Sequence, residues 1–113
     1  MEYPPCRKLI DSSAPVAIAT DFNPNAFCCS LPFVMNLAAV QMKMTLNEAL
    51  VAATLNAAAA LDKADKFGSI EIGKSGDFVV VDAPKWEHLI YELGGNTDTI
   101  SSVIKRGKVV MQL

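Results

Sequence analysis

The sequence predicts an α/β fold, with helices concentrated in the first half of the chain and strands in the second. Three observations support this prediction. Residues 4–12 have helical periodicity and lead into an apolar segment of strand length, residues 15–20, which together make half of the repeating unit of an α/β barrel. Residues 31–43 and 45–61 follow with helical patterns. Beyond residue 64 the apolar period changes to two and turn residues become frequent, which indicates a small β unit.

The first two predicted helices differ in how their apolar residues are distributed. In residues 4–12, Pro4 and Pro5 suit a first turn, and Cys6, Leu9 and Ile10 recur at helical spacing. Residues 31–43 instead have apolar side chains around most of the circumference: Leu31, Phe33, Val34, Met35, Leu37, Ala38, Val40 and Met42. A helix of this kind must be buried on several sides, and a chain of 113 residues offers little to bury it. The pattern therefore indicates partner structure that is missing.

The helix predicted over residues 45–61 has the clearest N-terminus. Thr45 and Glu48 have the spacing of a capping box, in which each side chain accepts a hydrogen bond from the other residue's backbone N–H. The alanines that follow permit close approach to a neighbouring element. Asn56 is expected to be an exposed or loop-bonded amide, so this helix is interpreted as structural.

The β unit is expected to hold alternating residues at 69–72, a strand at 78–81, a short helix near 86–93 and a hairpin of residues 100–105 and 108–111. Arg106 and Gly107 form the tight turn of that hairpin. Lys74 and Asp77 lie in a turn flanked by glycines, and a solvated turn with a surface ion contact explains them better than a catalytic pair.

Length and charge exclude several classes of function. The 113 residues are one domain's length at most, and an apolar content of 51% is enough to build a core. Ten basic and twelve acidic residues give a net charge of −2 without a basic cluster, so nothing points to nucleic acid or an anionic membrane. The longest uncharged run, residues 22–42, contains Asn, Pro, Ser and Gln and is interpreted as a loop and a buried helix. No signal peptide is recognised at the start, so a cytoplasmic location is expected.

The cysteines and the histidine are interpreted as structural. Cys6, Cys28 and Cys29 lack the spacing of a disulfide framework or a zinc site, and buried free thiols are expected. His88 is the only histidine, and one imidazole cannot hold a catalytic metal by itself. It is expected to be packed or hydrogen-bonded.

Asp21 is the candidate functional residue. It directly follows the apolar run of residues 15–20, and Asn23, Pro24 and Asn25 then force a turn. In parallel sheets and barrels, chemistry collects in the loops at the carboxyl ends of the strands. The alternative is an Asx turn in which the Asp21 carboxylate accepts hydrogen bonds from the backbone amides of residues 22–24.

Several motifs resemble the C-terminal portion of metal-dependent amidohydrolases. The resemblance extends from near residue 4 to the end of the chain and rests on Pro-Pro-Cys-Arg-Lys at 4–8, Ala-Thr-Asp-Phe-Asn-Pro-Asn at 19–25, Thr-Leu-Asn-Glu-Ala-Leu at 45–50 and Gly-Ser-Ile-Glu-Ile-Gly-Lys-Ser-Gly-Asp at 68–77. The Asp-Phe-Asn-Pro-Asn element and Trp-Glu-His-Leu-Ile-Tyr at 86–91 resemble the imidazolonepropionases in particular.

This resemblance implies a fold and a reaction. Residues 1–64 would be the last strand and closing helices of a (β/α)8 barrel, and residues 65–113 would be part of a small β-sandwich. Full-length members hydrolyse 4-imidazolone-5-propanoate to N-formimidoyl-L-glutamate in histidine degradation and are expected to be homodimers. Their zinc or iron is held by histidines from earlier strands and by one Asp.

The resemblance also implies roles for four residues. Asp21 matches the Asp that is both metal ligand and proton shuttle, and Asn23 matches a position that contacts substrate or product. Asn25 and Ala26 stand where many members have Gly and then Thr or Ser. A backbone contact at Asn25 survives that change, whereas a hydroxyl contact at Ala26 does not. Because the histidine ligands are absent, the isolated chain is expected to be inactive.

Two other interpretations stay open. The chain could belong to another amidohydrolase, such as a deaminase or a dihydroorotase-like enzyme. It could also be a non-catalytic interaction module, because the helix over residues 31–43 is apolar on nearly all sides and exposed apolar patches recruit partners.

Overall fold

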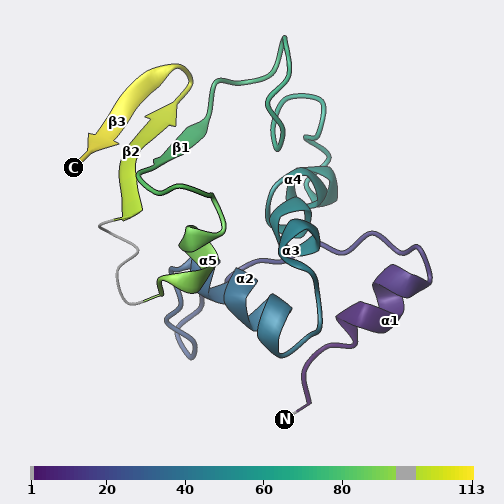
Figure 1. Ribbon diagram of the computed structural model, residues 1–113. Helices are drawn as coiled ribbons and strands as arrows, with labels where there is room; N and C mark the ends of the chain where they lie inside the picture. The colour runs from purple at the N-terminus through teal and green to yellow at the C-terminus, as the bar shows by residue number, and fades with distance from the viewer. Residues whose placement is uncertain (1, 94–98) are drawn as a thin grey trace.

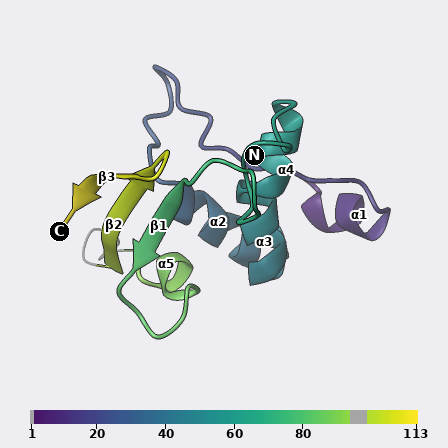
Figure 2. The same ribbon diagram turned by 90° about the horizontal axis from the view of Figure 1, so that it is seen from above.

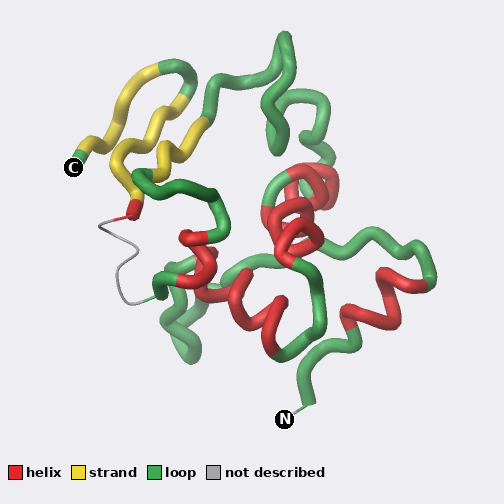
Figure 3. Tube along the Cα trace, in the orientation of Figure 1, coloured by secondary structure: helices red, strands yellow, loops and turns green. Residues whose placement is uncertain are grey.

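The computed structural model describes residues 2–93 and 99–113. Helices come first and a small sheet last, as Figures 1 and 3 show. The elements are α1 (Cys6–Asp11), α2 (Leu31–Val40), α3 (Leu46–Ala53), α4 (Leu55–Ala60), β1 (Phe78–Val81), α5 (His88–Tyr91), β2 (Ile100–Lys105) and β3 (Lys108–Gln112). The helix-rich first half and the β unit in the second half are confirmed. No helix in the described part of the chain is both long enough and apolar enough to cross a membrane.

The sheet is antiparallel with the strand order β1-β2-β3. Val79 pairs with Val103, and Val103 pairs with Met111. The β2–β3 hairpin turns at Arg106 and Gly107, both of which have positive φ, as a two-residue type I′ turn requires. The predicted hairpin is therefore confirmed. Every residue of β3 is exposed, so the described residues do not cover this edge strand of the sheet.

The core lies among the helices, on the side of α5 that faces away from the sheet (Figures 1 and 2). It contains mostly small or flexible side chains: Cys6, Met35, Ala38, Met44, Ala49, Ala52 and Ile90. The alanines allow α2 and α3 to approach closely. Asn36 Nδ2 on α2 donates to the carbonyl of Ile90 at 3.2 Å, which ties α5 to this core.

The capping box at the start of α3 is confirmed, but the predicted continuous helix is wrong. Thr45 Oγ1 accepts from Glu48 N at 3.2 Å, and Glu48 Oε2 accepts from Thr45 N at 2.7 Å. The helix then breaks at Thr54, where φ is −120° and ψ is −87°. The Thr54 hydroxyl donates to the carbonyl of Leu50 at 2.7 Å, a back-bond that bends helices.

The prediction of a strand at residues 15–20 is wrong, because this segment does not form the hydrogen bonds of a β-sheet. The segment is extended and half-buried at every second residue, but no strand pairs with it among the described residues. Instead Ile18 N donates to Ala52 O at 3.1 Å, and Asn56 Nδ2 donates to Val16 O at 2.8 Å. A β ladder needs a neighbouring strand, and the described part of the chain offers only helices there. Asn56 is the loop-bonded amide that we expected.

Two further boundaries differ from the prediction. Residues 69–72 form no strand, and Ile72 is fully exposed, because Gly68 and Gly73 on either side both have φ of +92° and divert the backbone. Helix α2 ends at Val40 because Lys43 takes a φ of +58°, and Met44 N then bonds back to Ala38 O at 3.1 Å. This return directs Met44 into the core.

An ion pair holds α1 to the start of α3. Arg7 Nη1 and Nη2 lie 2.9 and 3.0 Å from the two carboxylate oxygens of Glu48, and Arg7 Nε lies 2.8 Å from Asp11 Oδ1. Such bidentate geometry is the strongest form of an arginine–carboxylate contact. The Arg7 guanidinium and the backbone N–H of Thr45 together lower the pKa of Glu48 to about 2.

Replacing Glu48 by Gln tests this ion pair through its pH dependence. The folded pKa is depressed, so the carboxylate stabilises the fold above pH about 4.5, and this contribution is lost as the pH falls towards about 2. We expect Glu48→Gln to lower the Tm at neutral pH and to differ progressively less from wild type across that window. Thermal unfolding followed by circular dichroism measures this. The exposed Glu2→Gln variant is the control, and a Tm difference that stays constant with pH would contradict the assignment.

Gly68 packs its backbone against the helix break, and its replacement tests that contact. A Cβ at Gly68 would lie 2.8 Å from Leu55 Cα and from Thr54 O, and 2.9 Å from Ala58 Cβ. Gly73 has the same φ, but a Cβ added there would have no described atom within 4 Å outside its chain neighbours. Gly68→Ala should therefore destabilise the chain by about 1–3 kcal/mol more than Gly73→Ala. Because both positions have the same φ, this difference measures the steric clash apart from the backbone strain. Chemical denaturation of both variants measures the difference, and equal losses would exclude the close contact.

Candidate functional site

Asp21 begins an exposed loop that projects away from the helices between α1 and α2 (Figure 2). The loop closes on itself, since Asn23 N donates to Ala26 O at 3.2 Å and Ala26 N donates to Asn23 O at 3.0 Å. Pro24 and Asn25 form the corner, as the sequence predicts. The residues that the sequence nominates for the site therefore lie in one loop, with Asn23, Asn25 and Ala26 in the turn and Asp21 just before it.

The Asn23 amide holds the backbone on both sides of this turn. Its Nδ2 donates to the carbonyl of Asp21 at 2.6 Å, and its Oδ1 accepts from Asn25 N at 2.9 Å. Asp21 itself has a φ of +51°, a conformation that non-glycine residues adopt rarely and that clusters at functional sites. The side chain of Asn23 thus supports the strained backbone of Asp21.

The Asp21 carboxylate differs from the Asn23 amide in its contacts. It forms no hydrogen bond or ion pair with the described residues, so the alternative of an Asx turn made by Asp21 is wrong. Asn23 makes that turn instead, because its amide offers both a donor and an acceptor where a carboxylate offers only acceptors. The consequence is an exposed carboxylate on a loop whose shape does not depend on it.

Two aromatic rings flank the loop. Phe22 and Phe27 contact each other edge to face, with ring centroids 5.0 Å apart and an angle of 72° between the planes. Both are exposed, and Phe27 retains 85% of its accessible surface. Sequence reasoning missed this pair, although Phe residues on both sides of a tight turn are a visible signal. The loop therefore presents one carboxylate beside an apolar surface.

The described residues of this chain do not form a metal site by themselves. They include no group of three or more His, Cys, Asp or Glu side chains that could hold a metal ion. His88 Nδ1 is instead 2.9 Å from Glu92 Oε1 within the α5 region, which confirms its predicted hydrogen-bonded role. Asp21 could contribute only one ligand of a larger set, so the described residues alone do not fit a catalytic metal.

The thiols are free, as predicted, but they are not all buried. Cys6 is buried, Cys28 is half-buried and Cys29 is exposed. Cys29 lies in the loop that leads to α2, where the described chain leaves it open to solvent. The expectation of buried thiols is therefore right for Cys6 and wrong for Cys29.

Lys74 and Asp77 make the ion contacts that the structural interpretation predicts, and each has a different partner. Lys74 Nζ lies 3.1 Å from Glu71 Oε1 and also contacts Ser69. Asp77 pairs with Lys105 and accepts a hydrogen bond from Arg106 N, contacts that lower its pKa to about 2. Both residues therefore fasten turns of the β unit.

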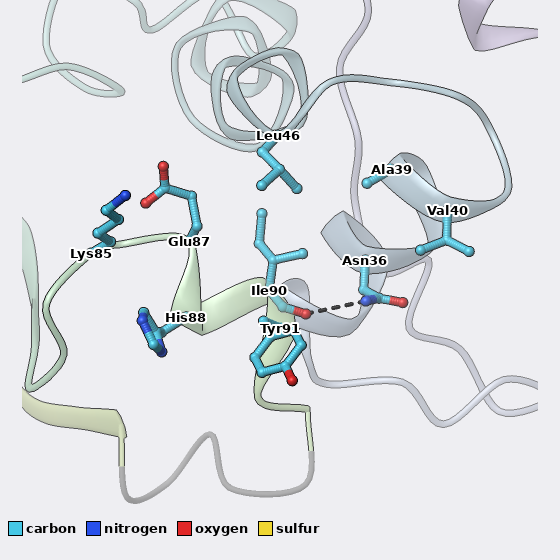
Figure 4. Close-up of a pocket in the computed structure, with 9 residues that line it drawn as sticks. All are labelled: Asn36, Ala39, Val40, Leu46, Lys85, Glu87, His88, Ile90 and Tyr91. Atoms are coloured by element: carbon cyan, nitrogen blue, oxygen red, sulfur yellow. Dashed lines mark hydrogen bonds between the residues drawn. The ribbon is translucent and has the colours of Figure 1, made fainter.

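A groove between α2 and α5 is a second candidate site that sequence reasoning did not find (Figure 4). It has a volume of about 410 Å³ and is mostly apolar. Its lining residues are Asn36, Ala39, Val40, Leu46, Lys85, Glu87, His88, Ile90 and Tyr91. The signal in the sequence was the apolar circumference of residues 31–43, which leaves part of α2 exposed here.

Replacing Asn23 by Ala tests its role in the loop. The variant loses both side-chain hydrogen bonds, so we expect the backbone N–H of Asn25 to exchange with solvent at least about tenfold faster. Amide hydrogen exchange followed by NMR measures this. Asn25→Ala is the matched control, since no hydrogen bond of its side chain is found among the described contacts and the N–H of residue 25 remains. Unchanged exchange in Asn23→Ala would show that the amide does not hold the loop.

The chain matches one protein family over nearly its whole length. Residues 2–110 match the family model described as "Amidohydrolase family". A protein of Nematostella vectensis named "Probable imidazolonepropionase" is 53% identical over 110 residues, which is 97% of this chain and 26% of that protein. The "Imidazolonepropionase" of Geobacillus sp. (strain WCH70) is 49% identical over 108 residues, 94% of this chain and 25% of that protein. The chain thus spans about a quarter of the length of these relatives.

Solved structures show the same fold at lower identity. An amidohydrolase from Thermotoga maritima MSB8 matches with a TM-score of 0.74 and 24% identity, covering 95% of this chain and 25% of that one. E. coli guanine deaminase matches with a TM-score of 0.71 and 20% identity, covering 96% of this chain and 30% of that one. At these identities the likeness concerns the fold.

Proposed function

This chain belongs to the amidohydrolase family, and we propose from that premise that it is the C-terminal portion of an imidazolonepropionase. The complete enzyme would hydrolyse 4-imidazolone-5-propanoate, a small molecule, to N-formimidoyl-L-glutamate. The observation that supports this most is the identity of about one half, over 97% of this chain, to a relative with that name. Because the chain spans only about a quarter of that relative, the activity belongs to the complete enzyme.

We assign residues 1–64 to the closing part of a (β/α)8 barrel and residues 65–113 to a β-sandwich. Two features support this division. The extended segment at residues 15–20 has no strand beside it among the described residues, as a barrel strand separated from its neighbours would have none. The sheet of the second half exposes all of β3, as one layer of a sandwich would without the other layer.

The metal of the complete enzyme, zinc or iron, would be held mainly by side chains outside this chain. Asp21 would supply one carboxylate ligand from the loop. Among the described residues, Asp21 belongs to no group of three or more His, Cys, Asp or Glu side chains that could hold a metal ion. The remaining ligands would come from the three quarters of the relatives' length that this chain does not cover.

Asp21 would also move a proton in the reaction. In the proposed hydrolysis, water adds to the carbonyl carbon of the ring, the ring C–N bond breaks, and the nitrogen that leaves gains a proton. A carboxylate within hydrogen-bond reach accepts the proton of the water and returns it to that nitrogen. The exposed and uncommitted carboxylate of Asp21 is suited to this role because no described residue competes for it.

Three neighbours would contact the substrate or product. Asn23 uses one N–H and one lone pair within the loop, which leaves one of each for a ligand. Asn25 would contribute a backbone contact. Ala26 lacks a hydroxyl and would contribute only backbone, and its N–H is already bonded to Asn23 O.

A non-catalytic interaction module is the second candidate. It is favoured by the groove beside α2 and by the incomplete metal site of the described residues. Another hydrolase or deaminase of the amidohydrolase family is a further candidate, supported by the fold that the chain shares with structures such as E. coli guanine deaminase.

A chimera tests the proposed function. The matching 110 residues of the Nematostella vectensis relative are replaced by those of this chain, and turnover of 4-imidazolone-5-propanoate is measured. We expect kcat/KM within about tenfold of the parent, because the identity is 53%. Asp21→Ala in the chimera should lower kcat/KM by about 10²–10⁴-fold, as expected for loss of a general base. The isolated chain should show no turnover above a metal-only blank.

The outcomes separate the candidates. A folded chimera without turnover, beside an active parent, would refute the assignment to this enzyme. Asn25→Ala in the chimera is the matched control, because only its backbone is assigned a contact, and it should retain turnover within about tenfold. Equal losses for Asp21→Ala and Asn25→Ala would contradict the special role of Asp21.

A further inference from the structure

We propose that Asn56 on α4 is a positioning residue for Asp21, which acts on the site through the extended segment of residues 15–20. Asn56 Nδ2 donates to the carbonyl of Val16 at 2.8 Å. Val16 lies five positions before Asp21, and five residues of extended chain span roughly 16 Å at about 3.3 Å per residue. Asn56 therefore affects the loop from a distance and is not assigned a contact with substrate. The inference rests on the proposed function and adds to it a residue outside the loop.

The loop that carries Asp21 makes no described hydrogen bond to a helix. Each described hydrogen bond of residues 21–28 joins two residues of that stretch or ends at Ser30. The position of the loop is therefore determined by the chain on its two sides. On one side Ser30 caps α2, its Oγ accepting from Phe33 N at 3.3 Å, and α2 belongs to the core. On the other side the loop continues from residues 15–20.

Two hydrogen bonds hold residues 15–20 in the described structure, and one of them comes from a side chain. Ile18 N donates to Ala52 O on α3 at 3.1 Å, and Asn56 supplies the other bond from α4. Val16 and Ile18 also pack against the core, but hydrophobic contacts are non-directional. A hydrogen bond is directional, so the Asn56 amide determines where along α4 the segment lies.

Loss of the Asn56 donor would leave the Val16 carbonyl without its described partner and release this end of the segment. A shift there is passed along the extended backbone to Asp21. Proton transfer needs heavy atoms about 2.6–3.2 Å apart, and a misplacement of about 1 Å can lower a rate by about 10²-fold. Binding of the substrate depends less on this one carboxylate, because most contacts would come from the three quarters of the relatives' length outside this chain. The expected signature is therefore a fall in kcat with little change in KM.

Steady-state kinetics of the chimera with the Nematostella vectensis relative tests this signature. Asn56→Asp keeps the size of the side chain, but an ionised carboxylate cannot donate a hydrogen bond. We expect kcat to fall about 10–100-fold while KM stays within about threefold. Asn47→Asp makes the same change at an exposed position of α3, where no hydrogen bond of the side chain is found among the described contacts, and should leave both within about twofold.

A second variant covers the case in which Asn56→Asp does not fold, as judged by circular dichroism. Asn56→Ala removes the donor without adding a charge and introduces the residue with the highest helix propensity, so it should show the same loss of kcat. The proposal is overturned if folded Asn56 variants match the Asn47→Asp control in kcat, or if only KM changes.

NMR of the 113-residue chain measures the link to the loop without turnover. Asn56→Asp should shift the backbone amide resonances of residues 20–23 and speed the exchange of these amides with solvent, whereas Asn47→Asp should do neither. Changes confined to the surroundings of Asn56 and Val16 would show that the link is absent and would overturn the proposal even if the chimera is active. A folded chimera that is inactive with Asn56 intact refutes the proposed function instead, and the NMR result then decides whether Asn56 positions Asp21.

Discussion

The packing of one extended segment against two helices is the constraint on which the rest of this structure depends. Residues 15–20 lie along α3 and α4, held by the bond from Ile18 N to Ala52 O and by the bond from Asn56 to Val16 O. Ala49 and Ala52 have almost no exposed surface, which shows how closely the neighbouring backbones approach them. The direction of the segment determines where Asp21 emerges, so the candidate site is positioned by helices that contribute no residue to it.

The helical half and the sheet are stabilised differently. Small side chains and methionines fill the helical core, and polar contacts such as Arg7 with Glu48 and Asn36 with Ile90 hold its edges. The sheet has no comparable core among the described residues, since β3 is exposed throughout. This imbalance agrees with a chain that spans about a quarter of the length of its relatives. Apolar side chains are open to solvent in the described structure, and some of them line the groove beside α2.

The candidate site illustrates how far sequence reasoning reaches. Asp21, Asn23, Asn25 and Ala26 were nominated together, and the structure places them in one loop. The Asn-Pro-Asn run made the turn predictable, but the sequence did not show which side chain would bond the backbone of the loop. A carboxylate and an amide are both common turn formers, and only the geometry shows that Asn23 bonds the backbone while Asp21 stays free of contacts with the described residues. The groove was unpredictable for a similar reason, because its walls come from α2, α3 and α5.

The sequence by itself determined the features whose interactions are local. The Thr45–Glu48 capping box and the turn at Arg106 and Gly107 involve residues a few positions apart, so their geometry follows from neighbouring side chains and allowed φ values. Tertiary structure alone decided the state of residues 15–20, whose β pattern cannot form a ladder without a second strand. It also decided the break at Thr54, where Gly68 packs against the helix. The physical reason is the same in both cases: a backbone group takes whichever partner the folded chain places beside it, and that partner lies far away in sequence.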